Sequence, residues 1–277
     1  MNQREPIRTE TSLEVEGIHH RFSPAAPWIL DDVGIKVKEG DFVAMVGASG
    51  SGKTTMLRIM AGLIEPTRGS VRVAGNDVTG HPDATRSMVF QADRLFPWRT
   101  AQANVAFGLE IQGHDKVSRN RAALESLRMV GLRGHEGTYP SELSGGMRQR
   151  VNLARALVLK PRFLLMDEPF AALDAQTREM MQKELLDILD STSAGVVFVT
   201  HQIEEALYLS DRVIVLGGQP ARIRATITSP FPRPRDLSTK RSPEFQKLHD
   251  EIWHEIEDDV KRAAVPSDPS AESDLPS

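Results

Sequence analysis

The sequence contains no cysteine in its 277 residues. Disulfides, zinc–thiolate centres and thiol nucleophiles are therefore excluded, and a reducing compartment is compatible with the chain. A long basic run is also missing, since Lys and Arg total 34 against 38 Asp and Glu, for a formal net charge of -4. We expect no nucleic-acid partner, because binding to a phosphate backbone relies on clustered positive charge.

Long hydrophobic runs are equally scarce. No apolar stretch approaches the ~20 residues of a membrane-spanning helix, and residues 1–6 lack the apolar core of a secretory signal. We therefore expect the chain not to cross a bilayer, so that any role at a membrane comes through a partner. Hydrophobic residues at 40% and charged residues at 26% are ordinary for a globular domain.

Short apolar runs alternate with helical patterns along the chain, which predicts an α/β core with a mostly parallel sheet. The run at 42–46 is typical of a strand buried on both faces. Helical patterns crowd together between 101 and 159 and predict a helical subdomain inserted between core strands. The expected strands are 13–18, 34–37, 42–46, 87–90, 163–166, 196–199, 212–216 and 222–228, and the expected helices are 53–60, 117–127, 147–159, 177–190 and 244–260.

These patterns divide the chain into parts. We expect a flexible N-terminus at 1–10, one main domain at 11–235 with its helical subdomain at about 92–160, and a C-terminal helix within 236–262. Residues 263–277 are rich in Pro, Ser, Asp and Glu, a composition that predicts a disordered tail.

A glycine-rich loop follows the apolar run at 42–46. Its sequence, Gly47-Ala48-Ser49-Gly50-Ser51-Gly52-Lys53-Thr54, fits the pattern G-x-x-x-x-G-K-[ST]. Backbone N–H groups and the N-terminus of the following helix favour a phosphate there, with Lys53 at the outer phosphates and Thr54 on Mg²⁺. Thr55, the next residue, is assigned to the same site. The alternative is a glycine-rich turn with an incidental lysine, and the loop alone does not distinguish a kinase, a GTPase and a transport ATPase.

Two acids, Asp167 and Glu168, end the apolar run at 163–166. A buried parallel strand would deliver them to the carboxyl edge of the sheet, where α/β folds bind ligands. We expect Asp167 to anchor Mg²⁺ and Glu168 to orient or deprotonate the attacking water. The alternative is an acidic turn after a core strand.

A third motif, Leu143-Ser144-Gly145-Gly146-Met147-Arg148-Gln149-Arg150, lies between these two. Ser144 precedes two glycines and then a helix, so Ser144, Gly145 and Gly146 could form a second anion site at a helix N-terminus. An ordinary N-capped helix start is the alternative. The motif resembles the signature sequence of ATP-binding cassette (ABC) proteins. The order of phosphate loop, Gln91, signature, carboxylate pair, Ala171-Ala172-Leu173-Asp174 and His201 is also that of the family, and the resemblance covers roughly residues 11–230.

The resemblance implies a P-loop NTPase core with an antiparallel β portion near the N-terminus, and a head-to-tail homodimer that binds ATP and Mg²⁺. It further implies that Gln91 contacts Mg²⁺ and the attacking water, that His201 holds the γ-phosphate and that Asp174 lies at the dimer seam. Phe22 matches the aromatic residue that stacks on adenine, with Trp28 as a substitute and a core position as the alternative for both. Ala171 and Phe22 stand where serine and tyrosine are common, and neither departure removes a catalytic group.

Four further stretches, less specific than the catalytic motifs, resemble the importers of nitrate, sulfonate and taurine. They are the stretches at 95–100, 231–236, 242–245 and 252–253. Phe96, Pro97 and Trp98 form an apolar patch near Gln91 that is suited to a helix of a membrane partner, with local packing as the alternative.

This branch implies two integral-membrane permease subunits, an extracytoplasmic solute-binding protein and a position at the cytoplasmic face of the plasma membrane. Sulfonate, taurine, nitrate, bicarbonate and a vitamin precursor all remain open as cargo. The rival function is a soluble, non-transport ABC ATPase that acts on a macromolecular partner.

Overall fold

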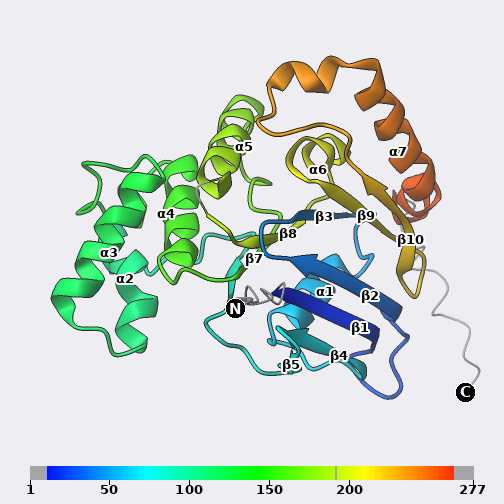
Figure 1. Ribbon diagram of the computed structural model, residues 1–277, viewed down its shortest axis with the longest axis horizontal. Helices are drawn as coiled ribbons and strands as arrows, with labels where there is room; N and C mark the ends of the chain where they lie inside the picture. Colours follow the sequence, from blue (N-terminus) through cyan, green and yellow to red (C-terminus); the bar gives the residue numbers. More distant parts are fainter. Residues whose placement is uncertain (1–10, 191, 265–277) are drawn as a thin grey trace, which may run out of the picture.

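The computed structural model describes residues 11–190 and 192–264 (Figure 1). The predicted N-terminal segment 1–10, and residues 265–277 of the predicted tail, lie outside these ranges. The described chain forms two β-sheets, with helices between them, on the outer face of the larger one and in a group to one side. Within 11–190 and 192–264, no helix combines the length and the hydropathy needed to cross a membrane.

The smaller sheet is antiparallel and has the strand order β2-β1-β4-β5. In β2, the apolar residues Val33, Ile35 and Val37 are buried and alternate with exposed positions, as expected for a sheet packed on one face. This sheet is the antiparallel portion predicted near the N-terminus. Its strands are β1 (Ser12–His20), β2 (Leu30–Lys38), β4 (Arg68–Val73) and β5 (Asn76–Asp77).

The larger sheet has the order β10-β9-β3-β8-β7-β6 and is parallel except for β10, which pairs antiparallel with β9. Three of its central strands are buried along their whole length, which explains their uninterrupted apolar sequences. Its strands are β3 (Phe42–Val46), β6 (Arg86–Val89), β7 (Phe163–Asp167), β8 (Gly195–Val199), β9 (Arg212–Gly217) and β10 (Arg222–Thr228).

Alternate residues of β3 enter two different cores. Val43 and Met45 pack with the smaller sheet and with α1 (Lys53–Met60), which lies between the sheets. Phe42, Ala44 and Val46 face the opposite core, which contains the apolar residues of the remaining helices. The helices on this second face are α5 (Ala175–Asp190), α6 (Ile203–Leu209) and α7 (Pro243–Ala264).

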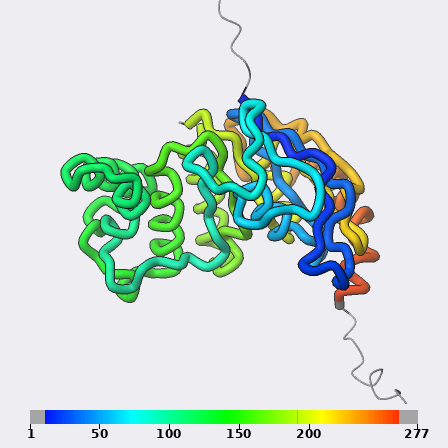
Figure 2. The backbone as a smooth tube through the Cα atoms, turned by 90° about the horizontal axis from the view of Figure 1, so that it is seen from below, coloured from blue at the N-terminus to red at the C-terminus, as the bar shows by residue number. Residues whose placement is uncertain are grey.

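Three helices stand together at one side of the sheets, at the left in Figure 1 and again in Figure 2. They are α2 (Ala101–Ile111), α3 (Lys116–Met129) and α4 (Gly145–Leu157). Thr100, Asp115 and Ser144 cap their N-termini with side-chain oxygens that accept backbone N–H bonds. These caps place the starts of α3 and α4 one and two residues before the predicted positions, and they separate α2 as a helix of its own.

Several elements differ from the sequence-based expectation. The structure adds β4, β5, α6 and the 3₁₀ turns η1 (Pro140–Glu142) and η2 (Leu237–Arg241). Helix α7 continues to Ala264, so residues 263 and 264 are helical and the prediction of a tail from 263 is wrong at these two positions. The basic residues Lys261 and Arg262 in the last turn favour this extension, because they face the negative end of the helix dipole.

Candidate functional site

The glycine-rich loop connects the carboxyl end of β3 to the N-terminus of α1. Gly50 and Gly52 have φ angles of 78° and 79°, a backbone conformation that residues with a Cβ adopt only at a cost in free energy. Gly47 is needed for a different reason, because a Cβ there would lie 2.3 Å from the carbonyl oxygen of Leu216. The predicted phosphate loop therefore has the strand–loop–helix context that its sequence pattern requires.

The side chain of Lys53 folds over this loop. Its Nζ donates hydrogen bonds to the carbonyl oxygens of Gly47 at 2.9 Å and Ala48 at 2.8 Å, and lies 3.3 Å from Ser51 Oγ. Lys53 is only 6% exposed, and this burial lowers the pKa of its ammonium, against the opposing charges of Glu168 and Asp167. The loop thus holds a desolvated positive charge where an anion would bind.

The two acids lie at the end of β7, as predicted. Asp167 Oδ1 accepts a hydrogen bond from the Thr54 hydroxyl at 2.8 Å, and burial raises the pKa of Asp167 above its usual range. Glu168 leaves the strand with a φ of 44°, in the left-handed region, and its backbone N–H donates to Val199 O. This bend separates the two carboxylates, so that Asp167 faces Thr54 while Glu168 enters the pocket described below.

Gln91 and His201 converge on Glu168. The Gln91 Nε2 donates to Glu168 Oε2 at 3.4 Å, and His201 Nδ1 lies 3.1 Å from the same oxygen. Gln91 follows β6 and His201 follows β8, the two strands that flank β7. Three neighbouring strands therefore deliver three polar side chains to one point at the carboxyl edge of the sheet.

The oxygen atoms at this edge suit Mg²⁺. The Thr54 hydroxyl and the Asp167 carboxylate are hard donors 2.8 Å apart, and Mg²⁺ usually takes one or two such protein groups together with phosphate oxygens. Gln91 and Glu168 lie in the adjoining pocket. The residues present therefore fit a metal that arrives with a phosphorylated ligand.

A cavity of about 700 Å³ opens beside the loop, a volume typical of small-molecule sites. Phe22 reaches it with a side chain that is largely exposed and packs edge-on against His20. Trp28 lies outside its lining and instead stacks with the Arg21 guanidinium, so the geometry favours Phe22 as the aromatic contact. The lining residues are Phe22, Ile29, Ser49, Gly50, Ser51, Gly52, Lys53, Thr54, Thr55, Gln91, Glu168 and His201.

The third motif lies outside this cavity. Ser144 caps α4 by accepting from the Met147 N–H at 3.3 Å, and Gly145 and Gly146 form its first turn. A Cβ on Gly146 would lie 3.1 Å from Thr177 Cγ2. We call Ser144, Gly145, Gly146 and Asp174 the signature surface.

Asp174 belongs to this surface through Thr177. The Asp174 carboxylate accepts from the Thr177 N–H at 3.0 Å, and this backbone hydrogen bond lowers the pKa of Asp174. The predicted residues thus form two separate groups, one around the cavity and one on the signature surface.

A polar network that was not predicted from the sequence fixes Thr200 and Gln202, the residues on either side of His201. Glu205 accepts a hydrogen bond from the Thr200 hydroxyl and another from Gln182 Nε2, the latter at 3.0 Å. The Gln202 N–H donates to Thr200 Oγ1 at 3.0 Å. A glutamate inside the apolar stretch of α6 was the available sequence signal, but its partners come from two other segments.

The segment after Gln91 combines local packing with an exposed apolar side chain, the two alternatives considered for it from the sequence. Phe96 packs against Phe107 with ring centroids 4.6 Å apart, which is local packing. Trp98 is 71% exposed. The buried Asn104 donates to the carbonyl oxygens of Phe96, Arg99 and Thr100 and accepts from the Phe96 N–H, so the turn that presents Trp98 is fixed.

Comparison with known proteins gives consistent results. A family model described as "ABC transporter" matches residues 30–171. An ABC transporter ATP-binding protein of Methanocaldococcus jannaschii is 46% identical over 258 residues, which cover 92% of this chain and 95% of that protein. The nitrate import ATP-binding protein NrtD of Synechocystis sp. is 47% identical, with coverage of 80% and 86%, and the taurine import ATP-binding protein TauB of Mesorhizobium japonicum is 48% identical, with 80% and 85%.

Solved structures agree with the fold. The dimeric ATP-binding cassette MJ0796 in a post-hydrolysis state, bound to ADP and Pi, matches with a TM-score of 0.69 at 31% identity. The match covers 79% of this chain and 99% of that one. The predicted α/β fold with its mostly parallel sheet, N-terminal antiparallel portion and inserted helices is confirmed.

Proposed function

Because this chain belongs to the ABC transporter family and is one of its ATP-hydrolysing subunits, we propose that it is the motor of a bacterial importer for a small anion or organic solute. The observation that carries the proposal is the convergence of Lys53, Gln91, Glu168 and His201 on one cavity beside the phosphate loop.

Each group around the cavity has a role in hydrolysis. Lys53 leaves the loop carbonyls and pairs with the outer phosphates of ATP, since an ammonium desolvated among carbonyls gains by meeting a phosphate charge. Glu168 orients and activates the attacking water, while Gln91 and His201 hold the water and the γ-phosphate in line. Thr54 and Asp167 would hold Mg²⁺, which would supply neutralising charge at the phosphate oxygens.

The signature surface completes the site in a second copy of the chain. Ser144 and the first N–H groups of α4 are exposed at a helix N-terminus, which favours an anion. They do not line the cavity of their own chain. A head-to-tail homodimer places each signature surface over the partner's phosphate loop, and Asp174 beside Thr177 then lies at the seam. The relative MJ0796 was solved as a dimer, which supports a homodimer of this chain.

Trp98 provides the coupling surface. It projects from a turn that Asn104 fixes. Only a short stretch of chain connects Trp98 to the catalytic Gln91, so movement of a partner bound at Trp98 could be transmitted to Gln91. We assign this surface to the membrane partner, two permease subunits served by an extracytoplasmic solute-binding protein. The subunit then sits peripherally at the cytoplasmic face of the membrane.

The relatives narrow the cargo class. Three relatives that are 44–48% identical to this chain are named as import ATP-binding proteins for nitrate or taurine, which favours a small anion or a sulfonate. The rival function, a soluble ABC ATPase with a macromolecular target, gains no support from the basic content of the sequence or from these relatives.

Affinity capture from native membranes tests the proposal. A tagged Glu168→Gln protein, held in its ATP-bound state, is expected to recover a polytopic membrane protein, identified by mass spectrometry. The matched control, Glu168→Gln with Trp98→Ala, should recover several-fold less, because an exposed tryptophan anchor is lost without damage to the fold. Recovery of ribosomes, nucleic acid or no partner would overturn the importer assignment and leave the ATPase in place.

A further inference from the structure

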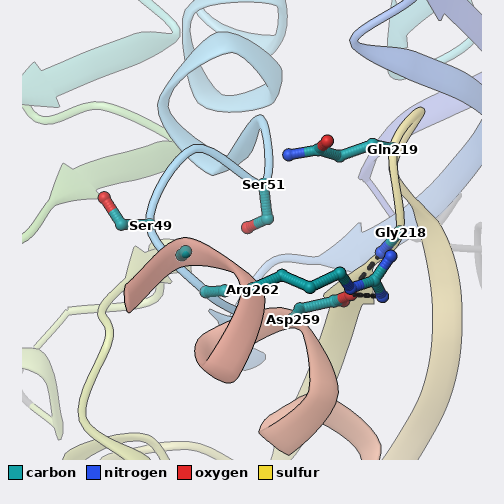
Figure 3. Close-up of a pocket in the computed structure, with 8 residues that line it drawn as sticks. Ser49, Ser51, Gly218, Gln219, Asp259 and Arg262 are labelled. Carbon is teal, nitrogen blue, oxygen red and sulfur yellow. Dashed lines mark hydrogen bonds and ion pairs between the residues drawn. The ribbon is translucent and has the colours of Figure 1, made fainter. Parts of the chain in front are cut away.

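The last turn of α7 lies against the phosphate loop, at Ser49 and Ser51, which also line the nucleotide cavity. Figure 3 shows Asp259 and Arg262 of this turn opposite Ser49 and Ser51 of the loop. A cavity of only about 30 Å³ lies between them, room for about one water molecule. Helix α7 is anchored further back by Phe245, Ile252 and Ile256, which are buried in the core, so its last turn has a fixed base.

Asp259 holds the turn between β9 and β10, residues 217–221, which we call the β9–β10 turn. Its carboxylate accepts from the Gly218 N–H at 2.8 Å and forms ion pairs with Arg224 at 3.1 Å and with Arg262. The side chain of Asp259 is only 10% exposed and that of Arg224 30%, so these two groups pair partly out of water, which strengthens the interaction, whereas Arg262 is 66% exposed. Asp259 is therefore a largely buried, fully partnered carboxylate that the hydrolysis site does not use.

The backbone at Gly217 leaves the space that the Asp259 carboxylate occupies. A Cβ on Gly217 would lie 2.5 Å from Arg224 Nε and 2.7 Å from Asp259 Oδ2, so a larger residue there would displace both groups. The pairing of β10 with β9 shifts register between Ile223 and Ala225, which is an irregularity at Arg224. Such irregularities re-aim a side chain, and Arg224 also donates from Nη1 to the Glu255 carbonyl of α7 at 2.7 Å.

The β9–β10 turn reaches the nucleotide site by two routes. Immediately before the turn, in β9, the Leu216 carbonyl oxygen is the atom against which Gly47 of the phosphate loop packs. At its end, Ala221 exchanges backbone hydrogen bonds with the segment that carries Ile29: the Ala221 N–H donates to Ile29 O, and the Asp31 N–H donates to Ala221 O. Ile29 lines the nucleotide cavity and contacts Gly52. The two ends of one turn are thus connected to the phosphate loop and to Ile29, which both line the nucleotide cavity.

From this geometry we propose that Asp259 is a positioning residue for nucleotide binding, which acts through the β9–β10 turn on the phosphate loop and on Ile29. Helix α7 is then part of the nucleotide site's support rather than an inert appendage. Coupling is reciprocal, because whatever ties α7 to nucleotide affinity must also make nucleotide stabilise α7. The inference rests on the nucleotide site proposed above.

Binding of Mg²⁺–ADP to the full-length chain, measured by calorimetry, tests the proposal. Asp259→Ala is expected to raise the Kd about fivefold or more, while kcat at saturating ATP stays within about twofold of the unmutated value, because no reacting group is touched. Asp259→Asn keeps an acceptor for the Gly218 N–H and should recover part of the affinity. Asp258→Ala, on the neighbouring exposed position of the same helix, is the matched control and should leave both quantities unchanged.

Hydrogen exchange on the unmutated protein gives a second readout that does not depend on a variant folding. Saturating Mg²⁺–ADP should slow exchange in the last turn of α7 and at Gly218. A lower melting temperature for Asp259→Ala with an unchanged Kd, or exchange in α7 that ignores nucleotide, would overturn the proposal. Failure of the unmutated chain to bind ADP at all would instead overturn the nucleotide site on which it rests.

Discussion

Replacement of Glu168 by glutamine is predicted to separate ATP binding from ATP hydrolysis. Glutamine has the same size, and its carbonyl oxygen can still accept from Gln91 Nε2 and meet His201, the two groups that now contact Glu168 Oε2. The left-handed backbone at this position does not change. What is lost is the ability to accept a proton from the attacking water.

The size of the effect follows from that loss. A positioned general base contributes roughly 10²–10⁴-fold to a rate, which corresponds to about 3–5 kcal/mol of activation free energy. ATP affinity should change by less than about threefold, because Lys53 and the loop amides that hold the phosphates are untouched. The closed ATP-bound dimer should therefore accumulate.

Single-turnover phosphate release measures the first quantity and equilibrium ATP binding measures the second. Glu204→Gln, an exposed glutamate at the start of α6, serves as the matched control and should hydrolyse ATP normally. If Glu168→Gln releases phosphate within about tenfold of the unmutated rate, the assignment of Glu168 as the base is wrong.

Two further predictions concern carboxylates whose pKa is raised by burial. Asp167→Asn removes a carboxylate charge whose burial is unfavourable without nucleotide but which is needed beside Mg²⁺. The Asp167→Asn variant should therefore melt, without nucleotide, at the same temperature as the unmutated chain or at a higher one. The rise of roughly 5–10 °C that saturating Mg²⁺–ATP gives the unmutated chain should largely disappear in this variant. Burial raises the pKa of Glu205 above its ordinary value of 4.5, so Glu205 keeps its proton in the folded chain at pH values where it has lost it in the unfolded chain. The free energy of unfolding therefore falls as the pH rises above 4.5. Glu205→Gln should therefore gain stability relative to the unmutated chain as pH rises from 4 to 7 in urea titrations, and an identical gain in Glu204→Gln would contradict this account.

Much of the fold could be predicted because its central strands carry their own pattern. The segments at 42–46 and 163–166 are buried on both faces, so an uninterrupted apolar run was sufficient to predict each strand. Helix α6 was missed because its seven residues are almost all buried and show no amphipathic period. Strand β4 was missed because Arg68, Gly69 and Ser70 give it a polar first half.

In the candidate site, too, some residues could be predicted from the sequence and others could not. The phosphate loop and the carboxylate pair are contiguous in sequence, and each has a strand that aims it, so their chemistry could be predicted. The roles of Ile29, Glu205 and Asp259 depend on partners far along the chain, which no local pattern reveals. Asp259 is one acid among several in the same helix. Its hydrogen bond from the Gly218 N–H and its ion pair with Arg224, both made to distant residues, distinguish it from the exposed Asp258.

The central claim is that each ATP is hydrolysed between the phosphate loop of one chain and the signature surface of another. Mixing two inactive variants, Lys53→Ala and Ser144→Arg, tests it most directly. In a mixed dimer, one site joins the intact loop of the Ser144→Arg chain to the intact signature surface of the Lys53→Ala chain, and the other site is doubly damaged. With equal amounts and random pairing, half of the dimers are mixed and one of their two sites is intact, so we predict recovery of about a quarter of the unmutated ATPase rate. A mixture as inactive as its two components would contradict the account.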